Sequence, residues 1–501
     1  MKTIFLLFDS LNLKVLETYG STHFATPNFR RLSRRAVTFG KHFVGSMPCM
    51  PARRDMQSGR LNFLHRGWGP LEPFDNSFPE LLKQHDVYAH LISDHYHYFE
   101  DGGATYHTRY TSFDFIRGQE RDPWKAMVAP PIERFRETHH KLHMDKFEND
   151  KSRLAYAVNR DFIKEEKDFP SVQCFAAGLE FLKTNKDADD WCLQIETFDP
   201  HEPFFAPDRF RALFDSGYRG PFLDWPDYGK VDETPEEVAE LRANYFALVC
   251  LCDHLLGTIL DFLDAHDMWD DTALVLTTDH GFLLGEHDWW GKGQMPIYDE
   301  IAHIPLFFHH PDFAHLAGTK CNALTQNIDL MPTFLELHGV EVPKEVQGIS
   351  LMQTLQNGSQ RKAALYGYWG SGINITDGRH SYFWYPENDH NAALNQYTLM
   401  PTNMQSFFSA EDLQGAELTN QFSFTKGFPV MRVPYTQKSS NKNIMSNIDN
   451  ASMLFDIEKD PLQLTPIVDA QIADGLKSTI LEMIDAMEAP PELVARFQNS
   501  R

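Results

Sequence analysis

Cys49 and Arg53, in the run Cys-Met-Pro-Ala-Arg, have residue types and a spacing that could support nucleophilic chemistry on an anion. Pro51 suits the first turn of a helix, where its missing N–H costs nothing. Cys49 would then lie at a helix N-terminus, whose unpaired N–H groups and dipole favour anions. Arg53 follows one turn later and could bind an oxyanion in a forked geometry. From the residues alone, Cys49 is either a low-pKa thiolate nucleophile or an ordinary buried cysteine.

Asp9 and the pair Asp279-His280 are candidate metal ligands, because they directly follow apolar runs. Carboxylate oxygens together with one imidazole suit a hard or borderline divalent cation. Asp9 alone would serve equally well as a turn or helix-cap carboxylate. The position of Asp279-His280 before Gly281, at an expected strand end, favours metal binding over a structural role.

Four apolar runs end abruptly in polar residues, and helix-length segments separate them. Continuous apolar runs of this kind indicate strands buried on both faces of a mainly parallel sheet. Thr26-Pro27 and Thr234-Pro235 open the clearest helical patterns. The alternation predicts a large, doubly wound α/β fold flanked by helices, whose ligands bind beyond the carboxyl ends of the strands. The four runs are residues 3–8, 87–92, 191–195 and 273–278.

The composition shifts after about residue 360, where short strand-like pieces replace the longer apolar runs. We predict a catalytic α/β domain over residues 1–360. A smaller C-terminal α+β domain with an antiparallel sheet would cover residues 361–501 and end in a helix at 469–486. Residues 101–167 are expected to be an insertion over the active-site face. Its histidine cluster is expected to be a solvated surface patch rather than a ligand set; its members are His139, His140 and His143.

The charge of the chain is strongly acidic, although its composition is otherwise that of a globular protein. Its 501 residues include 46 Lys+Arg and 70 Asp+Glu, which gives a formal net charge of −24. Such a charge repels nucleic-acid backbones and anionic membranes, so neither is expected as a partner. If the substrate is an anion, the positive charge that binds it must be local to the site.

The cysteine content and the apolar runs bear on the cellular compartment. Six cysteines in so long a chain do not suggest a disulfide framework, and Cys250 and Cys252 do not have zinc-site spacing. All except Cys49 are expected to be small buried hydrophobes. The apolar run of five residues before Asp9 is too short for a signal peptide, and no segment offers about 18 consecutive apolar residues. We therefore expect a soluble, cytoplasmic protein.

The sequence resembles the type I sulfatases of the alkaline phosphatase superfamily, whose signature is Cys-x-Pro-Ser/Ala-Arg. The run that begins at Cys49 fits this signature, and four other stretches fit the family in order: FDSLN, DPHEPF, TTDHGFLLGEHDWWGK and LFDIEKDPLQ. Together they extend from near the N-terminus to about position 463. In that family a maturation enzyme converts the cysteine to Cα-formylglycine, and the hydrated aldehyde is the nucleophile. The resemblance implies the same modification at Cys49.

The resemblance also implies a metal shell made of Asp9, Asp279, His280 and the modified Cys49. Many members of the family have two adjacent aspartates at the first site, whereas Ser10 follows Asp9 here. This departure leaves Asn12 or a water to complete the coordination. Four protein carboxylates would favour Ca²⁺, while fewer carboxylates and an imidazole admit Mn²⁺. One divalent cation, Ca²⁺ or Mn²⁺, is therefore expected.

Two further side chains match the family's residues on the leaving-group side. Lys292, in WWGKG, matches a lysine that touches both the leaving-group oxygen and a sulfate oxygen. His201, in DPHEP, matches a histidine that protonates the leaving group, a task that suits the pKa of imidazole. Arg53 and Lys292 would share the charge of the bound anion.

The stretch SDHYHYFEDGG occupies the place where many sulfatases have Lys-x-x-His. We expect His95 to act as the base near the hydrated aldehyde, with His97 behind it and Asp94 as its orienting partner. A second group of residues is expected near the opening of the site; its members are Arg66, Trp68 and Glu72.

These features predict a hydrolase of sulfate monoesters, aryl sulfates first among them. The nearest alternative is a phosphonate monoester hydrolase or phosphodiesterase that uses the same site, and one enzyme could catalyse both reactions. Related enzymes of that kind assemble as oligomers, so a homo-oligomer is expected. In a different class, the chain would be a metal-binding protein with unconverted Cys49 and no turnover. Three tryptophans could form an aromatic or sugar-binding wall: Trp68, Trp289 and Trp290.

Overall fold

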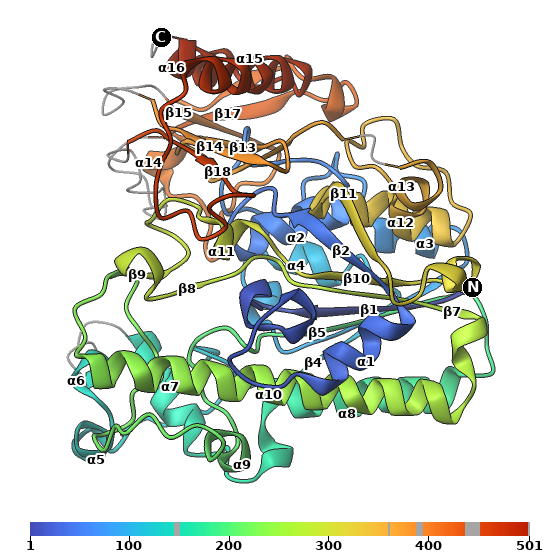
Figure 1. Ribbon diagram of the computed structural model, residues 1–501. Helices are drawn as coiled ribbons and strands as arrows, with labels where there is room; N and C mark the ends of the chain where they lie inside the picture. Colours follow the sequence, from blue (N-terminus) through green and yellow to red (C-terminus); the bar gives the residue numbers. More distant parts are fainter. Residues whose placement is uncertain (145–150, 359–360, 387–393, 436–450, 499–501) are drawn as a thin grey trace.

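An eight-stranded sheet forms the centre of the molecule, with helices on both faces (Figure 1). The computed structural model describes residues 1–144, 151–358, 361–386, 394–435 and 451–498. The strand order is β11-β2-β10-β7-β1-β5-β3-β4. Neighbouring strands are parallel, except that β10 runs antiparallel to β2 and β7. The predicted doubly wound, mostly parallel fold is confirmed.

The strands correspond to the apolar runs of the sequence. Each of the four runs that end in polar residues lies in β1, β3, β5 or β7, and these strands are almost wholly buried. The eight strands are β1 (Lys2–Phe8), β2 (Val37–Phe43), β3 (Tyr88–Ser93), β4 (Ser112–Phe115), β5 (Trp191–Thr197), β7 (Thr272–Thr277), β10 (Leu306–His309) and β11 (Lys320–Gln326).

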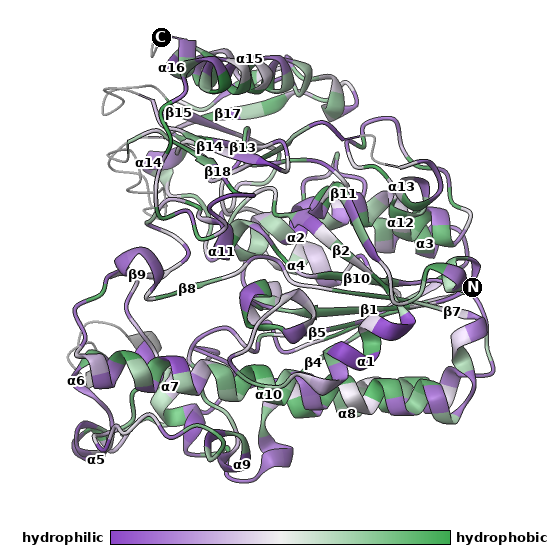
Figure 2. Ribbon diagram, in the orientation of Figure 1, coloured by the Kyte–Doolittle hydropathy of each residue, from purple (hydrophilic) through white to green (hydrophobic). Residues whose placement is uncertain are grey.

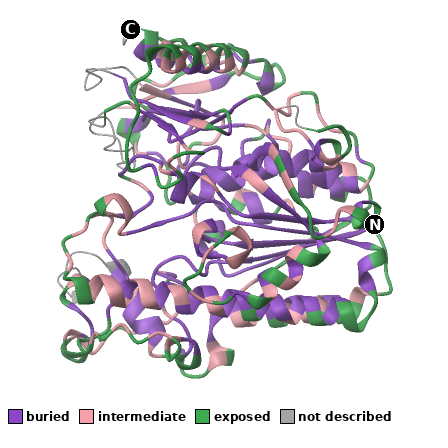
Figure 3. Ribbon diagram, in the orientation of Figure 1, coloured by how far each residue is buried: buried purple, intermediate pink, exposed green. Residues whose placement is uncertain are grey.

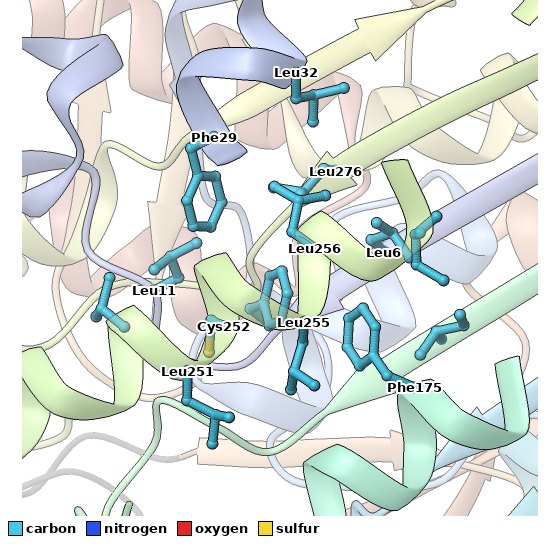
Figure 4. Packing of buried hydrophobic residues seen from close by; sticks show 14 of the residues in the cluster. Leu6, Leu11, Phe29, Leu32, Phe175, Leu251, Cys252, Leu255, Leu256 and Leu276 are labelled. Atoms are coloured by element: carbon cyan, nitrogen blue, oxygen red, sulfur yellow. The ribbon is translucent and has the colours of Figure 1, made fainter. Parts of the chain in front are cut away.

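Alternate residues of the central strand β1 pack against different helix layers. Leu6 faces a cluster with α1, α8 and α10, while Phe5 faces a cluster with α3 and α12. Figure 4 shows Leu6, Leu276 and Phe175 of α8 within this cluster. Each fully buried side chain of this size contributes about 1.5–3 kcal/mol. The helices are α1 (Pro27–Arg35), α2 (Cys49–Ser58), α3 (Phe78–Gln84), α8 (Pro170–Asn185), α10 (Pro235–Ala265) and α12 (Leu330–Leu337).

The longest helix, α10, supports the sheet from below in the view of Figure 1. It begins with a capping box between Thr234 and Glu237, whose side chains accept from each other's backbone N–H groups. Pro235, in the first turn, has no N–H that needs a partner. By length and hydropathy it could cross a membrane, but 72% of its most apolar window is buried inside the protein. Figures 2 and 3 show its hydrophobic residues and its buried side. It therefore packs as the core helix of this layer.

Antiparallel sheets occupy the C-terminal part, as predicted. A four-stranded sheet, in the order β12-β13-β14-β18, packs against α15 and α16 through a cluster that includes Ile375, Trp384, Ile480 and Phe497. Its elements are β12 (Ala364–Gly367), β13 (Ile373–Thr376), β14 (His380–Trp384), β18 (Met453–Asp456), α15 (Ala470–Ala486) and α16 (Pro491–Gln498). A three-stranded sheet consists of β15 (Leu394–Thr398), β17 (Val430–Tyr435) and β16 (Glu417–Thr419). The domain boundary at residue 360 stays a prediction.

Part of the region expected to be an insertion belongs to the main sheet. β4 pairs in parallel with β3, with Ser112 aligned with His90. It forms one edge of the sheet. The other elements of this region are α4 (Ala104–His107), α5 (Ile132–Thr138), α6 (Lys141–Met144) and α7 (Lys151–Arg160). The remaining elements elsewhere are α9 (Asp208–Arg211), β6 (Gly229–Lys230), β8 (Leu283–Leu284), β9 (Trp289–Gly291), α11 (Asp299–Ala302), α13 (Leu351–Asn357) and α14 (Ala410–Leu413).

The histidine cluster at 139–143 is buried, so the expectation of a solvated patch is wrong. The exposed fractions of His139, His140 and His143 are 5%, 8% and 1%. Nε2 of His140 lies 2.9 Å from a carboxylate oxygen of Glu237 at the start of α10, and His143 faces Asp224 at 3.6 Å. These contacts with carboxylates offset the cost of burying the histidines, and they hold this region against the rest of the fold.

Candidate active site

Four polar clusters meet at the carboxyl ends of the central strands, where a doubly wound fold binds its ligands. Asp9 directly follows β1, and Asp279 comes two residues after β7. His95 and His201 follow β3 and β5. Side-chain atoms of Asp9, Cys49, Asp279 and His280 lie within 4.8 Å of one another, and all four residues are buried. The fold thus brings together the four residues for which the sequence implied a metal shell.

The chemistry of this donor set fits a divalent cation. Nδ1 of His280 lies 3.0 Å from the carbonyl oxygen of Gly281, so it carries the proton and leaves the lone pair on Nε2. That nitrogen lies 3.1 Å from Oδ2 of Asp279 and 3.3 Å from Sγ of Cys49. Burial and the charge of Asp9 raise the pKa of Asp279 to about 7, a cost that a bound cation would offset. Two carboxylates and one imidazole suit Mn²⁺ or Ca²⁺.

Arg53 joins three carboxylates behind the donor cluster. Its Nη2 lies 2.8 Å from Asp9 Oδ2, its Nη1 lies 2.7 Å from Asp279 Oδ2, and its Nε lies 2.6 Å from Glu196 Oε1. Nη1 also donates to the carbonyl oxygen of Cys49 at 3.0 Å, one helical turn earlier. All three guanidinium nitrogens are engaged, so Arg53 positions the carboxylates. The three carboxylates carry more negative charge than Arg53 and Lys292 carry positive charge. This surplus of negative charge suits a bound cation.

Sequence reasoning missed Glu196, which lies inside the buried strand β5 and is 0% exposed. It also accepts hydrogen bonds from Tyr98 Oη at 2.9 Å and Gln194 Nε2 at 2.8 Å. The available signal was a charged residue directly after the apolar run 191–195, because a carboxylate that stays buried at a strand end needs a partner.

Ser10, at the place of the family's second aspartate, connects Lys292 to Asp9. Lys292 Nζ donates to Ser10 Oγ at 2.8 Å, and Ser10 Oγ donates to Asp9 Oδ1 at 2.8 Å. Ser10 has a positive φ of 63°, and its N–H donates to Asp279 Oδ1 at 3.1 Å. Asn12 does not face the cluster, since its side-chain amide bonds the backbone N–H and carbonyl of Phe282. Of the two expected alternatives, Asn12 therefore does not complete the coordination, and a water stays the prediction.

His95 is fully buried with Nε2 3.5 Å from Asp9 Oδ2, and among the described residues neither ring nitrogen makes a hydrogen bond. Burial and the charge of Arg53 lower its pKa well below the ordinary value. Asp94 does not orient this ring, contrary to expectation, because it accepts from the N–H of Phe198 at 2.7 Å and from Gln119. The structure thus places a neutral imidazole beside the cluster.

His201 and Lys292 lie on one side of the cluster. Nδ1 of His201 donates to the carbonyl oxygen of Glu202, so Nε2 is the free ring nitrogen. Burial and the positive charge of Lys292 lower the pKa of His201. Burial lowers the pKa of Lys292, but the nearby acids, Asp9 among them, outweigh burial and hold this pKa above its ordinary value. In the free protein Lys292 therefore carries a proton, whereas His201 is neutral.

Cys49 is the first residue of α2 and is 3% exposed, as the sequence predicted for a helix start. Burial, and then the charge of Asp9, raise the pKa of its thiol well above the ordinary value. A thiol in this environment stays protonated, although a helix N-terminus favours anions. Of the two alternatives that the residues left open, this environment without a cation favours the buried cysteine over the low-pKa thiolate.

The residues expected near the opening differ in their placement. Arg66 and Glu72 are buried. Arg66 donates to the carbonyl oxygen of Thr402, and Glu72 accepts from the N–H of Leu399 at 2.8 Å, so both contact the C-terminal part. Trp68 packs edge-on against His97, with ring centroids 5.3 Å apart, and is half-buried. Trp290 is fully buried and does not contribute to a wall.

Comparison with known proteins adds three findings. A family model described as "Sulfatase" matches residues 2–340. The choline-sulfatase of Rhizobium meliloti is 26% identical over 396 residues, 72% of each chain. Arylsulfatase K of Mus musculus is 30% identical over 381 residues, 71% of this chain and 64% of its own. The crystal structure of a phosphonate monoester hydrolase of Agrobacterium radiobacter superposes with a TM-score of 0.64 at 18% identity, over 97% of this chain and 96% of that one.

Proposed function

The chain belongs to the sulfatase family, and we propose that it hydrolyses sulfate monoesters, aryl sulfates among them, with residue 49 in the Cα-formylglycine form. The observation that carries the proposal is the position of Cys49: it begins α2 and shares one buried cluster with Asp9, Asp279 and His280. The protonated thiol described above is a poor nucleophile, which supports conversion by a maturation enzyme. The arylsulfatase relative supports aryl esters as substrates.

We propose that Asp9, Asp279, His280 and residue 49 hold one divalent cation, Mn²⁺ or Ca²⁺. When present, the hydrated aldehyde supplies the nucleophilic oxygen, and the cation supplies positive charge for the anionic oxygens of the ester. Arg53 keeps Asp9 and Asp279 in fixed positions through its hydrogen bonds. The site is preorganised in this way before the substrate binds.

The remaining side chains move protons. His95, neutral at pH 7, is available to accept a proton beside residue 49. Lys292 donates a hydrogen bond to the oxygen that leaves. A bound anionic ester would raise the low pKa of His201, because it opposes the charge of Lys292, and a protonated His201 could then donate to the same oxygen.

A second candidate function uses the same site for phosphonate monoesters or phosphodiesters. Each of these substrates carries one negative charge on a tetrahedral centre, as a sulfate monoester does. The cations of the site, Arg53 and Lys292, are already engaged by carboxylates or by Ser10, which suits a monoanion better than a dianion.

We also propose, as expected from the sequence, a cytoplasmic homo-oligomer, which cell fractionation and light scattering would test.

The decisive experiment combines chemistry at residue 49 with a comparison of substrates. Mass analysis of the peptide that contains Cys49 should show an aldehyde in place of the thiol. Cys49→Ala should abolish turnover and retain the fold, and Cys49→Ser should accept the sulfuryl group but release it slowly, since it has no second hydroxyl. Comparing kcat/KM on an aryl sulfate, an aryl phosphonate monoester and a phosphodiester separates the two functions. An unconverted thiol without turnover would favour the non-catalytic alternative, and near-native activity of Cys49→Ala would refute the covalent mechanism.

A further inference from the structure

The carboxylate of Glu202 lies against Nδ1 of His201. Glu202 follows His201 directly and is 3% exposed. Its Oε2 lies 3.2 Å from Nδ1, which donates a hydrogen bond to the backbone carbonyl oxygen of Glu202 at 2.5 Å. The side chain and the backbone of Glu202 thus meet the same nitrogen, and Nε2 stays free on the opposite side of the ring. A carboxylate in this position fixes the tautomer of an imidazole and stabilises its protonated form.

One oxygen of this carboxylate is anchored, and the other has no hydrogen-bond donor of its own. Tyr228 Oη donates to Oε1 of Glu202 at 2.6 Å. Within the described part of the chain, the buried Oε2 makes no hydrogen bond. An unpaired carboxylate oxygen is costly to bury, and Nδ1–H of His201 is the donor beside it. Protonation of His201 would make this N–H a stronger, charged donor, so its hydrogen bond would then favour Oε2 over the carbonyl oxygen.

Tyr228 connects the carboxylate to the segment that carries Lys292. Its ring lies against Gly291, directly before Lys292, so closely that a Cβ on Gly291 would lie 2.7 Å from a ring carbon. Gly291 also has a φ of 106°, which residues with a side chain rarely adopt. The strands next to these two residues, β6 and β9, pair in the small antiparallel sheet. The Tyr228 hydroxyl, and with it the carboxylate of Glu202, therefore has a fixed position on the leaving-group side.

The charge of Glu202 depends on the charge of its neighbours. Burial raises its pKa to about 7, against the opposing effects of Lys292 and of the hydrogen bond from Tyr228. In the free protein, in which His201 is neutral, the carboxyl group is therefore near the midpoint of its titration at neutral pH. An imidazolium 3.2 Å away would favour the carboxylate, and the carboxylate would favour the imidazolium by the same free energy. The two residues thus become charged together.

We propose that Glu202 is a positioning residue for leaving-group protonation: its carboxylate holds His201 at Nδ1 and stabilises the imidazolium, which donates from Nε2 to the departing oxygen. This inference rests on the proposed function, which supplies the sulfate ester. When the S–O bond breaks, its electron pair goes to the leaving oxygen, and this oxygen takes the Nε2 proton. His201 returns to the neutral form with its proton on Nδ1, and it regains the Nε2 proton from water before the next turnover.

The dependence of kcat/KM on leaving-group pKa tests this role in Glu202→Gln, which keeps the shape of the side chain and removes its charge. We expect hydrolysis of phenyl sulfate to fall about ten-fold or more and that of nitrophenyl sulfate to change little, so the slope becomes steeper. Tyr228→Phe removes the hydrogen bond to Oε1 and should have a smaller effect in the same direction. Glu133→Gln, at a side chain that is 84% exposed, is the matched control and should leave the slope unchanged.

A double-mutant cycle shows whether Glu202 acts through His201. In the His201→Ala background, Glu202→Gln should cause no further loss of kcat/KM on phenyl sulfate, because the group that it supports is absent. Additive losses in the two substitutions, or an unchanged slope in Glu202→Gln alone, would overturn the inference. A merely structural role would lower kcat/KM for all esters equally and would not change the slope.

A further measurement does not require turnover. Nitrogen NMR of histidine-labelled, metal-loaded Cys49→Ala protein, with phenyl sulfate bound, gives the pKa of His201, and the spectrum of His201→Ala assigns its signals. We expect Glu202→Gln to lower this pKa by about one unit or more, a ten-fold change in the acid dissociation constant. An equal pKa with and without the charge of Glu202 would also overturn the inference. Failure of the proposed function would appear separately, as absence of turnover in the formylglycine-containing protein.

Discussion

Nε of Arg53 lies 2.6 Å from Oε1 of Glu196, and both side chains are almost completely buried. Glu196 is held in turn by Tyr98 and Gln194. The contact therefore connects the guanidinium that fixes Asp9 and Asp279 to a rigid strand of the main sheet. Glu196 touches none of the proposed reacting atoms, so it is a positioning residue.

Glu196→Ala should lower both stability and turnover. Removing one partner of a buried ion pair costs about 3 kcal/mol of unfolding free energy. A displaced Arg53 would also misplace the two carboxylates, and misplacement by about 1 Å can cost roughly 100-fold in kcat. Urea unfolding and steady-state kinetics measure the two effects, and Glu196→Gln should be milder in both. A Glu196→Ala protein with native kcat would show that Asp9 and Asp279 hold Arg53 without help.

Removal of Asp279 should lower both metal content and activity. Asp279 provides a charged ligand atom, whereas His280 provides a neutral imidazole that water can replace. We therefore expect Asp279→Ala to lose most of the bound cation and His280→Ala to lose less. Elemental analysis of the purified proteins gives the stoichiometry, with Asp187→Ala, 87% exposed, as the control. A full equivalent of the same cation in Asp279→Ala would contradict this ligand assignment.

The sequence predicted the elements of the fold better than the contacts within the site. Apolar runs ending in polar residues place Asp9, Asp279 and His280 correctly, because parallel strands end at a common edge. No local pattern could show that Ser10 links Lys292 to Asp9, or that Asn12 faces Phe282, since both depend on chain segments far apart in sequence. Side-chain hydrogen bonds follow from the packed fold, and a pattern of residue types does not contain them.

The orientation of Asp94 and the burial of the 139–143 histidines have the same cause. Polar residues in a stretch with few apolar neighbours suggest a solvated surface. The fold instead supplies distant partners, Glu237 for His140 and Phe198 for Asp94, which offset the cost of burial. Burial of polar groups is therefore the property that a single sequence predicts least well.

His65 should make the protein sensitive to acid. It is 6% exposed, and burial lowers its pKa to about 3, against about 6.5 in the unfolded chain. Below pH 6.5 the unfolded state therefore binds a proton that the folded state does not. This lowers the stability by about 1.4 kcal/mol per pH unit until the pH approaches 3. The stabilising contribution is complete above pH 6.5 and is lost as the pH falls.

His65→Gln should remove the contribution of this one proton to the slope of unfolding free energy against pH. The amide of the introduced glutamine could still reach the carbonyl oxygen of Glu488, to which His65 Nε2 is bonded at 2.9 Å. We expect the variant to be slightly less stable than the native protein at pH 7.5 and to gain on it by about 2.7 kcal/mol by pH 4.5. Urea unfolding at several pH values measures the difference, and the exposed His315→Gln is the control. Parallel pH profiles for native protein and His65→Gln would mean that His65 is not the titrating group.

The role of His201 depends on its protonation in the substrate complex. In the free protein, burial and Lys292 lower its pKa, and its Nδ1 proton is engaged by the carbonyl oxygen of Glu202. His201 would be protonated, and so able to act as an acid, only with an anion bound beside it. Lys292 carries a proton with or without the bound anion. General acid catalysis matters most for basic leaving groups, which depart poorly without a proton. Leaving-group dependence therefore distinguishes an acid from a residue that positions the substrate.

His201→Ala should slow phenyl sulfates strongly and nitrophenyl sulfates much less. General acids contribute roughly 100- to 10,000-fold, so a plot of log(kcat/KM) against leaving-group pKa should be clearly steeper for the variant than for the native protein. Lys292→Ala provides the matched comparison, because its ammonium group lies on the same side of the site. A uniform drop with an unchanged slope for His201→Ala, together with a steeper slope for Lys292→Ala, would assign the acid to Lys292. His201 would then act by positioning the substrate through its free Nε2.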